Sequence, residues 1–528
     1  MAKLYAENTE LQQKILNGVN KLADNVAATL GPKGRNVILS TGGGKPIITK
    51  DGVTVANFVE LEDPFEHAAA SLIKQVASET NNVAGDGTTT STVLAREILR
   101  NSQKYLAAGS SPVEMKKGMD KAVLEITKKI ENLSQVVESI DDIQHVATIS
   151  ANGDQKIGKL IAQAADKVGH DGSILVQPGR ALETTLDLVE GFRFSSGYFS
   201  QSFVTDERRN AVLYEDALIL VTDHKVDNVK EILPVLELAA RESKPLIIVA
   251  ENVEGQALAA LIMNSVRGSM KVAAVKAPGF GRERTDLMKD LCLATGAKFI
   301  SRLSGYTFDS VRLVDFGLCK KIEVLKGETT IMGGSADWEK IDSKIDSLKS
   351  EIKQTESLEE CDKMQRRITR LSSGVAVINV GGLTEVEMTE RKHRIEDALE
   401  AVRSAQEEGI VPGGGVALLS CQGFKIEHEN DDQMIGATII RRSLEAPVRQ
   451  MSANSSESAD IIIDKIKVSS KRKKNKNLGW DFKTCQIVDM MEEGIVDPAK
   501  VTRVALQNAV SVSSTLITTS NAIIGDSK

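Results

Sequence analysis

A short segment rich in glycine and threonine contains the residue types that could bind a metal-bound polyphosphate. It runs Gly85-Asp86-Gly87-Thr88-Thr89-Thr90 and leads directly into a helical apolar pattern. Glycines let the backbone approach a ligand closely, and a helix N-terminus offers unpaired N–H groups and the positive end of a dipole. The threonine hydroxyls add donors, and the Asp86 carboxylate is a ligand that Mg²⁺ accepts beside phosphate. The segment therefore predicts a nucleotide site, although it lacks the Walker A spacing of P-loop enzymes.

The same segment has a simpler interpretation, because Gly-Asp-Gly alone is typical of a tight turn before a capped helix. The run of three threonines favours the phosphate site.

Helices must position this segment. Apolar residues recur at helical spacing from Leu11 to Val26, and Gly31-Pro32 then breaks the pattern. Further helices are predicted over 65–80, 88–108 and 112–132. From about residue 190, short β-branched runs at 217–221, 245–249 and 271–275 alternate with amphipathic segments, which is typical of βαβ units. Residues 338–371 predict a helical hairpin, and helical patterns return beyond 408. Both ends of the chain are therefore expected to build one domain, with the middle inserted.

The composition of the chain argues against several classes of function. A chain of 528 residues is long enough for two or three domains. A formal net charge of −7 argues against a general binder of nucleic acid or acidic membranes. The five cysteines are scattered and form no CxxC motif, as is usual in a reducing compartment. No secretory pattern or membrane-length apolar run is present, so a cytoplasmic protein with no membrane and no nucleic-acid partner is expected.

Five motifs in one register carry a family resemblance. They are Thr29-Leu30-Gly31-Pro32-Lys33-Gly34-Arg35-Asn36, Ile48-Thr49-Lys50-Asp51-Gly52-Val53-Thr54, Ala84-Gly85-Asp86-Gly87-Thr88-Thr89-Thr90, Val411-Pro412-Gly413-Gly414-Gly415-Val416 and Gly494-Ile495-Val496-Asp497-Pro498. Together they resemble the group I chaperonins, the GroEL/Hsp60/Cpn60 family, over essentially the whole chain.

The resemblance implies a GroEL-like multidomain α/β fold. It has a mainly helical equatorial ATP-binding domain (1–132 and 408–528), a small α/β intermediate domain (133–189 and 376–407) and an α/β apical domain (190–375). Its hinges fall at Gly191 and Gly374.

By resemblance, the nucleotide would be ATP, held with Mg²⁺ on Asp86 and with K⁺ on the backbone of Thr29 and Lys50. Asp497 would bind the ribose, and Ile495 would pack on the base. The implied ATP-binding set is Thr29, Leu30, Gly31, Pro32, Lys50, Asp51, Asp86, Gly87, Thr88, Thr89, Thr90, Ser150, Gly413, Gly414, Gly415, Asp481, Ile495 and Asp497.

Hydrolysis of ATP requires a carboxylate that faces the attacking water, while metal and donors neutralise the transferring phosphoryl group. The resemblance assigns the first task to Asp397 and places Asp51 at the phosphates. Without the resemblance, Asp397 would be interpreted as a solvated helix residue. A carboxylate on an inserted domain could also couple hydrolysis to domain closure.

The resemblance further implies capture of non-native proteins and of a GroES-like co-chaperonin on the apical domain. The implied contacts are Tyr198, Phe203, Leu233, Leu236, Leu258, Ile262 and Met263. From the pattern alone, the helical spacing of four of them favours a buried core stripe, and only the resemblance makes them a binding groove; they are Leu233, Leu236, Leu258 and Ile262. The region 190–375 has no long insertion that could serve as a built-in lid, so a separate lid protein is expected. A homo-oligomeric ring, heptameric in the family, would enclose the client.

Several positions depart from the family pattern. Ser458 replaces an acidic partner of the ring-to-ring contact at Arg449, so single and double rings both stay open. Asp481 replaces an asparagine near the adenine, and the sequence ends without Gly-Gly-Met repeats. The basic run at 471–476 is interpreted as a solvated loop.

Two other classes of function fit parts of the sequence. A non-folding scaffold could keep the nucleotide site for structure alone, but the presence of Asp51, Asp86 and Asp397 counts against it. A small-molecule phosphotransferase would need an acceptor pocket with its own base, and no such constellation is evident.

Overall fold

The computed structural model describes residues 3–40, 46–168, 173–179, 181–189, 191–355, 357–372 and 375–525. The chain divides into two compact units. Unit 1 comprises Met1–Gln163, Arg180–Glu183 and Val380–Lys528, and unit 2 comprises Ala164–Gly179 and Thr184–Asn379. Unit 1 thus draws on both ends of the chain, whereas the three-domain division stays a prediction. Among the described residues, no helix combines the length and apolar character needed to cross a bilayer.

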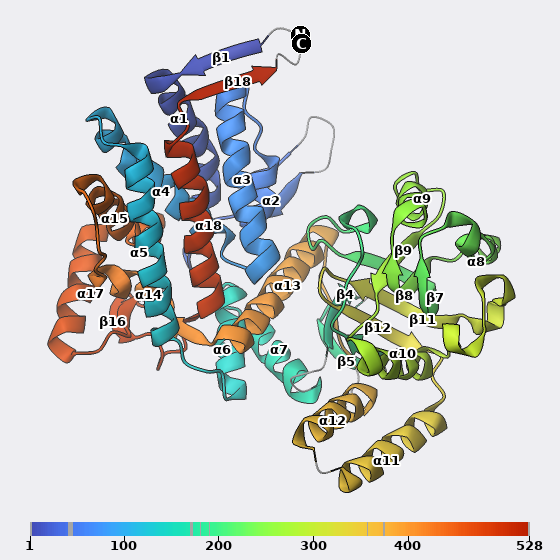
Figure 1. The fold of residues 1–528 in the computed structure, drawn as a ribbon. Helices are drawn as coiled ribbons and strands as arrows, with labels where there is room; N and C mark the ends of the chain where they lie inside the picture. Colours follow the sequence, from blue (N-terminus) through green and yellow to red (C-terminus); the bar gives the residue numbers. More distant parts are fainter. Residues whose placement is uncertain are drawn as a thin grey trace. The chain divides into compact units, whose positions relative to one another are not determined.

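Unit 1 is built mainly from helices (Figure 1). They are α1 (Asn8–Ala27), α2 (Gly52–Phe58), α3 (Pro64–Ala84), α4 (Thr88–Ala107), α5 (Pro112–Leu133), α6 (Ile140–Ser150), α13 (Glu385–Glu408), α14 (Val416–Ser420), α15 (Asp431–Ser443), α16 (Ala446–Asn454), α17 (Ala459–Lys473) and α18 (Ala499–Ile517). The helix α7 (Gln155–Val168) begins in unit 1 and ends in unit 2. The helices predicted before residue 132 are confirmed as α1, α3, α4 and α5, because long amphipathic periodicity is the most reliable sequence signal.

The core of unit 1 lies where α18 packs against α3, α4 and α5, and where α1 packs against α3 and α4. Aliphatic side chains such as Leu22, Ile73, Leu94 and Ile126 are fully buried there. Four two-stranded sheets complete the unit: β1 (Lys3–Glu7) with β18 (Asn521–Gly525), β2 (Val37–Leu39) with β3 (Ile47–Thr49), β14 (Ile410–Pro412) with β17 (Val496–Pro498), and β15 (Leu478–Asp481) with β16 (Gln486–Asp489). The pairing of β1 with β18 joins the two ends of the chain.

Unit 2 has a seven-stranded sheet in the order β6-β12-β11-β7-β8-β9, with β10 pairing β7. Its strands are β6 (Gly191–Phe194), β7 (Val212–Val226), β8 (Leu246–Val253), β9 (Val272–Lys276), β10 (Phe299–Ile300), β11 (Gly317–Val324) and β12 (Thr329–Gly334). The parallel pairs β7-β8 and β8-β9 confirm the βαβ interpretation. A second sheet has the order β4-β13-β5, from β4 (Ser173–Pro178), β5 (Thr185–Val189) and β13 (Val375–Val380).

Among the described residues, five α-helices accompany the larger sheet: α8 (Val229–Glu242), α9 (Gly255–Val266), α10 (Gly281–Thr295), α11 (Trp338–Gln354) and α12 (Leu358–Ser372). The helices α8 and α9 contact each other, whereas α10 contacts α11 and α12. This grouping follows from right-handed crossovers, since β7 to β8 to β9 advances along the sheet and β9 to β10 returns. The predicted helical hairpin is confirmed as α11 and α12, whose Arg367 makes a two-bond ion pair with buried Asp290 of α10.

Candidate functional site

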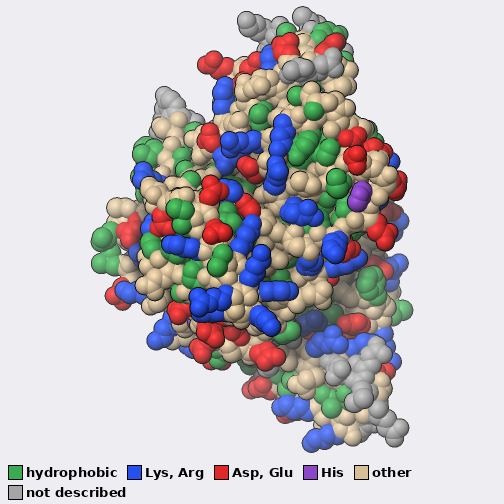
Figure 2. Space-filling model, turned by 90° about the vertical axis from the view of Figure 1, so that its left-hand side faces the viewer, with side chains coloured by type: hydrophobic (Ala, Val, Ile, Leu, Met, Phe, Trp, Pro, Cys, Tyr) green, Lys and Arg blue, Asp and Glu red, His purple; other side chains and the backbone are tan. Residues whose placement is uncertain are grey.

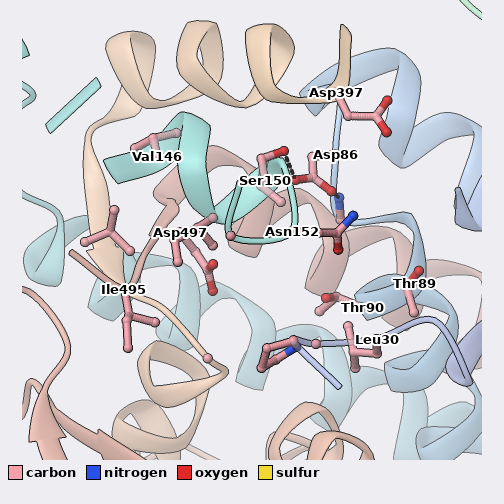
Figure 3. Close-up of a pocket in the computed structure, with 18 of the residues that line it drawn as sticks. Leu30, Asp86, Thr89, Thr90, Val146, Ser150, Asn152, Asp397, Ile495 and Asp497 are labelled. Carbon is pink, nitrogen blue, oxygen red and sulfur yellow. Dashed lines mark hydrogen bonds between the residues drawn. The ribbon is translucent and has the colours of Figure 1, made fainter. Parts of the chain in front are cut away.

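A cavity of about 530 Å³ lies within unit 1, where segments from both ends of the chain meet (Figure 3). Its walls come from the loop after α1, the start of α4, the end of α6, one face of α13, the Gly414-Gly415 turn, the β15–β16 hairpin and residues 493–498. All the residues predicted to bind nucleotide line it, except Gly413. Gly413 lies behind the wall, where its N–H donates to the Ile495 carbonyl at 2.9 Å.

The start of α4 forms the floor of the site. Gly85 and Gly87 both adopt left-handed backbone conformations, with φ of 72° and 84°. A Cβ on Gly87 would lie 2.7 Å from Cγ1 of Val501, so the turn needs glycine for its φ and for its packing. No side chain caps the helix that begins at Thr88, and its first-turn N–H groups are therefore left for a ligand.

Asp86 is the buried carboxylate at this helix start. Its Oδ1 accepts the Gly87 N–H at 2.5 Å, and its Oδ2 accepts the Ser150 hydroxyl at 3.1 Å (Figure 3). Burial raises the pKa of Asp86, the nearby Asp51 charge raises it further, and the two hydrogen bonds lower it. The ionised form of Asp86 is therefore disfavoured in the empty cavity, and a bound cation would stabilise it.

Asp497 is a second buried carboxylate, placed by the pairing of β17 with β14. Burial and the charge of Asp86 raise the pKa of Asp497 to about 7, against one opposing hydrogen bond from the Gly414 backbone. The glycine turn is shaped for close approach: Gly414 and Gly415 have φ of 63° and 77°. Asp497 and Ile495 are two residues apart in the sequence, and both point into the cavity (Figure 3).

The loop after α1 supplies the opposite wall. The Thr29 hydroxyl donates to the Val26 carbonyl at 2.8 Å and lies 3.3 Å from the Thr89 hydroxyl, so the loop is tied to the first turn of α4. Gly31 has φ of 82°, and a Cβ there would lie 2.7 Å from Cγ of Met451.

Asp51 has a structural task in addition to the predicted one. It caps α2, accepting the N–H groups of Val53 and Thr54 at 3.2 and 3.1 Å and the Thr54 hydroxyl at 2.5 Å. This capping could have been recognised in the sequence from aspartate three residues before threonine. The α2 start also abuts α4, because a Cβ on Gly52 would lie 2.6 Å from the Thr88 and Thr89 hydroxyls.

Lys50 lies next to Asp51 in the wall of the cavity. Burial, and then the Arg394 charge, lower the pKa of the Lys50 ammonium.

Asp397 reaches the same cavity from α13 (Figure 3). Arg394 of the same helix also lines the cavity. The Arg394 guanidinium pairs with Glu390 at 2.7 Å and lies 3.7 Å from the Asp154 carboxylate. Residues from α13 and from α4 thus line one cavity of unit 1, as hydrolysis by Asp397 would require.

Several lining residues were missed by the sequence analysis. Asn152 and Lys483 are the clearest. The Lys483 ammonium lies across from Gly153, where an added Cβ would be 2.4 Å from Nζ. No family motif includes Lys483, and only the register of the β15–β16 hairpin brings it to the cavity. Asp481 is one of the predicted residues. Its carboxylate accepts hydrogen bonds from the backbone N–H of Lys483 at 2.8 Å and from the Thr484 hydroxyl at 2.7 Å.

The side chains that line the cavity could hold Mg²⁺ only if a bound ligand supplied further oxygen atoms. Within the described ranges, no three His, Cys, Asp or Glu side chains are grouped so that they could hold a metal ion. Mg²⁺ commonly binds through one or two carboxylates, with water and substrate phosphates completing its shell. Asp86 fits that use, because its uncompensated charge would be stabilised by a cation.

The predicted apical residues lie in unit 2 and differ widely in exposure. Leu233 on α8 and Met263 on α9 are 45% and 50% exposed. Leu258 and Ile262 are partly buried against the core of unit 2. The others are buried in that core: Tyr198, Phe203 and Leu236. The neighbouring Val266, which the sequence analysis missed, is 68% exposed.

One of the two predicted hinge glycines, Gly191, lies among the described residues. Gly374 lies outside the described residues. Gly191 opens β6, where a Cβ would lie 2.4 Å from Cγ2 of Val375 and 2.5 Å from the Ile331 carbonyl oxygen. Close packing between strands is therefore reason enough for glycine at 191, and its role as a hinge stays a prediction.

Comparison with known proteins places this geometry in a family. Residues 22–527 match the TCP-1/cpn60 chaperonin family. Among solved structures, the fold resembles the chaperonin gp146 from bacteriophage EL 2 (Pseudomonas aeruginosa), crystallised in the presence of ATP-BeFx. The two chains share 20% identity, the match covers 99% of each, and the TM-score is 0.67. The fold is thus GroEL-like, and the chain belongs to the TCP-1/cpn60 chaperonin family.

Proposed function

We propose that this protein is an ATP-dependent chaperonin, which captures non-native proteins and assists their folding in a ring-shaped chamber. The observation that carries the proposal is the cavity of unit 1, where an uncapped helix start and the carboxylates of Asp86, Asp397 and Asp497 come together. Family membership supports it, as does the phage chaperonin of the same fold that was crystallised with ATP-BeFx.

In this proposal ATP spans the cavity. The phosphates lie at the N-terminus of α4, where N–H groups and the hydroxyls of Thr88, Thr89 and Thr90 donate to them. The ribose hydroxyls donate to Asp497, and the base packs on Ile495. Asp86 would hold Mg²⁺, and the backbone carbonyls of Thr29 and Lys50 would hold K⁺. The metal would neutralise charge that develops on the phosphates.

Hydrolysis is assigned to Asp397. Its carboxylate accepts a hydrogen bond from the attacking water and aligns that water with the γ-phosphate. Lys50 and Arg394 add positive charge to the same wall of the cavity, which favours the negatively charged phosphoryl group during transfer.

Client capture is assigned to unit 2. Leu233, Met263 and Val266 place exposed aliphatic surface along the neighbouring helices α8 and α9, and such surface binds other apolar chains. The buried residues Phe203 and Leu236 would then support this surface from beneath.

A homo-oligomeric ring, expected to be heptameric, and a GroES-like co-chaperonin complete the proposal, because one subunit cannot enclose a client. A cytoplasmic location is proposed as well. The five cysteines are free thiols, which suits a reducing compartment.

The variant Asp397→Ala tests the assignment of the site. We expect ATP binding to persist, because the phosphate and ribose contacts remain, and turnover to fall by about 100-fold or more. Binding is measured by calorimetry and turnover by phosphate release. The matched control is Glu407→Ala, an exposed carboxylate on the same helix that does not line the cavity. Unchanged turnover would remove Asp397 from the mechanism, and a non-folding scaffold would follow if the parent protein also hydrolysed no ATP.

A further inference from the structure

The C-terminal half of α17 and the loop after it carry an excess of positive charge that the nucleotide site does not use. Within residues 465–476 stand seven basic side chains and no acidic one. Only Lys467 is paired, with Glu445 at 2.8 Å. The other six are exposed, and none forms an ion pair with a described carboxylate; they are Lys465, Lys471, Arg472, Lys473, Lys474 and Lys476. These six residues are called the basic surface below.

Local stability does not account for this charge. Lysine and arginine in the last turn of a helix are favoured by the helix dipole, which explains two or three of them. Lys474 and Lys476 lie beyond the helix end, and Lys474 adopts a left-handed conformation with φ of 52° that glycine or asparagine would adopt more easily. Six like charges so close together repel one another, so the cluster is a cost that a bound anion would relieve.

The basic surface continues onto neighbouring elements of unit 1. The Lys129 ammonium of α5 lies 3.9 Å from the Cβ position of Gly423, and the charges of Lys129 and Lys476 both lower the pKa of the buried Cys421 thiol, which burial raises. Figure 2 looks onto the side of the molecule where α17 lies in Figure 1. Lys and Arg side chains are numerous across its middle, with acidic and apolar side chains between them.

Aliphatic side chains share the exposed stripe of α17 with the cations. Ile461, Lys465, Val468 and Arg472 follow one another at spacings of four, three and four residues, which places them on one face of the helix. Ile461 is 58% exposed and Val468 is 55% exposed. The opposite face buries Ile462, Ile463 and Ile466 in the core of the unit. The exposed face therefore offers both charge and apolar contact.

This combination favours a protein partner over a nucleic acid. Single-stranded nucleic acid is usually held by exposed aromatic rings on which bases stack. Here Trp480 is 8% exposed and lies under the Lys465 ammonium, which is 5.0 Å from its ring centre, and Phe482 is 3% exposed. The surface is also short. Its charged part ends at the exposed carboxylate of Asp464, which would repel a long polyanion laid along the helix, whereas Asp460 is paired with Arg449 at 2.9 Å.

We propose that the basic surface and the adjoining Val468 and Ile461 form a docking site for an acidic segment of another protein that also carries aliphatic side chains. The helical part from 465 to 473 spans roughly 12 Å at 1.5 Å per residue. This length matches an acidic segment with three or four carboxylates. None of the six residues of the basic surface lines the nucleotide cavity, so this docking site does not depend on the proposed function.

The test uses the full chain and a fluorescent peptide of about 15 residues, in which glutamates alternate with pairs of leucine and alanine. Fluorescence anisotropy measures its Kd at about 0.05 M and about 0.3 M salt. The neutral variant is Lys471→Gln, Arg472→Gln, Lys473→Gln and Lys476→Gln. The matched control removes four exposed lysines elsewhere, as Lys156→Gln, Lys159→Gln, Lys271→Gln and Lys289→Gln, so that both proteins have the same net charge.

We expect the neutral variant to bind the peptide at least about tenfold more weakly, with the control unchanged and with affinity falling as salt rises. Val468→Ser should weaken binding of this peptide by a few fold, yet leave binding of polyglutamate unaltered. Unchanged ATP turnover and unchanged circular dichroism would show that each variant is folded. Equal peptide binding by the neutral variant and the control would overturn the proposal. So would tighter binding of a DNA oligonucleotide of the same net charge.

Discussion

At the scale of single residues, the site is organised by carboxylates that are buried before any ligand arrives. Asp86 and Asp497 each have a raised pKa because each is desolvated and near another acid. Such clustering is unfavourable for the folded protein alone, and it is found where a cation or donor-rich ligand is bound. The arrangement links the stability of the nucleotide-free protein to pH.

The variant Asp497→Asn measures how far this residue makes the stability of the nucleotide-free protein depend on pH. Because the folded-state pKa of Asp497 is about 7, folded Asp497 keeps its proton while the unfolded residue ionises at its usual lower pKa. The stabilising contribution is thus fully present below about pH 4 and is lost as the pH rises through about 7. Between about pH 5.5 and pH 8, the free energy of unfolding of the nucleotide-free protein should fall by about 2 kcal/mol more than that of Asp497→Asn.

Denaturant unfolding at several pH values provides the measurement, and Asp464→Asn, on the exposed side of α17, provides the control. Parallel pH profiles for the parent protein and Asp497→Asn would contradict the raised pKa.

Sequence reasoning located these carboxylates through motifs, and its failures have physical causes. Asp86 and Asp497 stand in glycine-containing segments whose chemistry is local, so the sequence around them was informative. Lys483 reaches the cavity only because the β15–β16 hairpin folds back onto the loop at Gly153, a contact between positions more than 300 residues apart. Buried Phe203 shows the same limit, because a family register says which residues correspond and not how deeply each is buried.

At the scale of elements, the phosphate site depends on how α3 ends and α4 begins. The two helices are separated by Gly85-Asp86-Gly87, and both glycines are left-handed. The helices themselves were predictable, because amphipathic periodicity and the glycine breaks agree there. Their packing was not, because the contact of Gly87 with Val501 joins the two ends of the chain.

We expect Gly87→Ala to lower both stability and nucleotide affinity. Its Cβ would be strained by a φ of 84° and would lie 2.7 Å from Cγ1 of Val501, at a cost of about 2 to 4 kcal/mol in unfolding free energy. Gly109→Ala is the matched control, since Gly109 has φ of 88° but open space around its Cβ position. It should lose only about 1 to 2 kcal/mol and keep its nucleotide affinity. Similar losses in both variants would show that the contact with Val501 does not hold the site.

At the scale of the whole molecule, the proposed function needs ATP hydrolysis in unit 1 and client capture in unit 2. Unit 1 contains the nucleotide cavity, and unit 2 contains the exposed aliphatic residues of α8 and α9. If capture belongs to unit 2, it can be weakened without loss of ATP turnover.

The double variant Leu233→Ser and Met263→Ser should therefore bind an unfolded client about tenfold more weakly and hydrolyse ATP at the parent rate, because it removes exposed aliphatic area and leaves the core in place. Leu236 is unsuited to this test, since it is 7% exposed and its loss would disturb packing. Co-sedimentation with a denatured client reports capture. The control is Leu182→Ser and Leu188→Ser, which removes two leucines that are more exposed and lie on neither helix. Undiminished capture by the first variant would exclude α8 and α9 as the client surface.

The most direct test of the central claim is the recovery of enzymatic activity by a chemically denatured client, with the parent protein and with Asp397→Ala, in the presence and absence of ATP. An ATP-driven chaperonin should restore the client's activity over repeated cycles only when ATP is supplied. The variant Asp397→Ala should capture the client and bind ATP, yet restore far less activity. Recovery that is equal with and without ATP, or equal for the two proteins, would contradict an ATP-driven folding function.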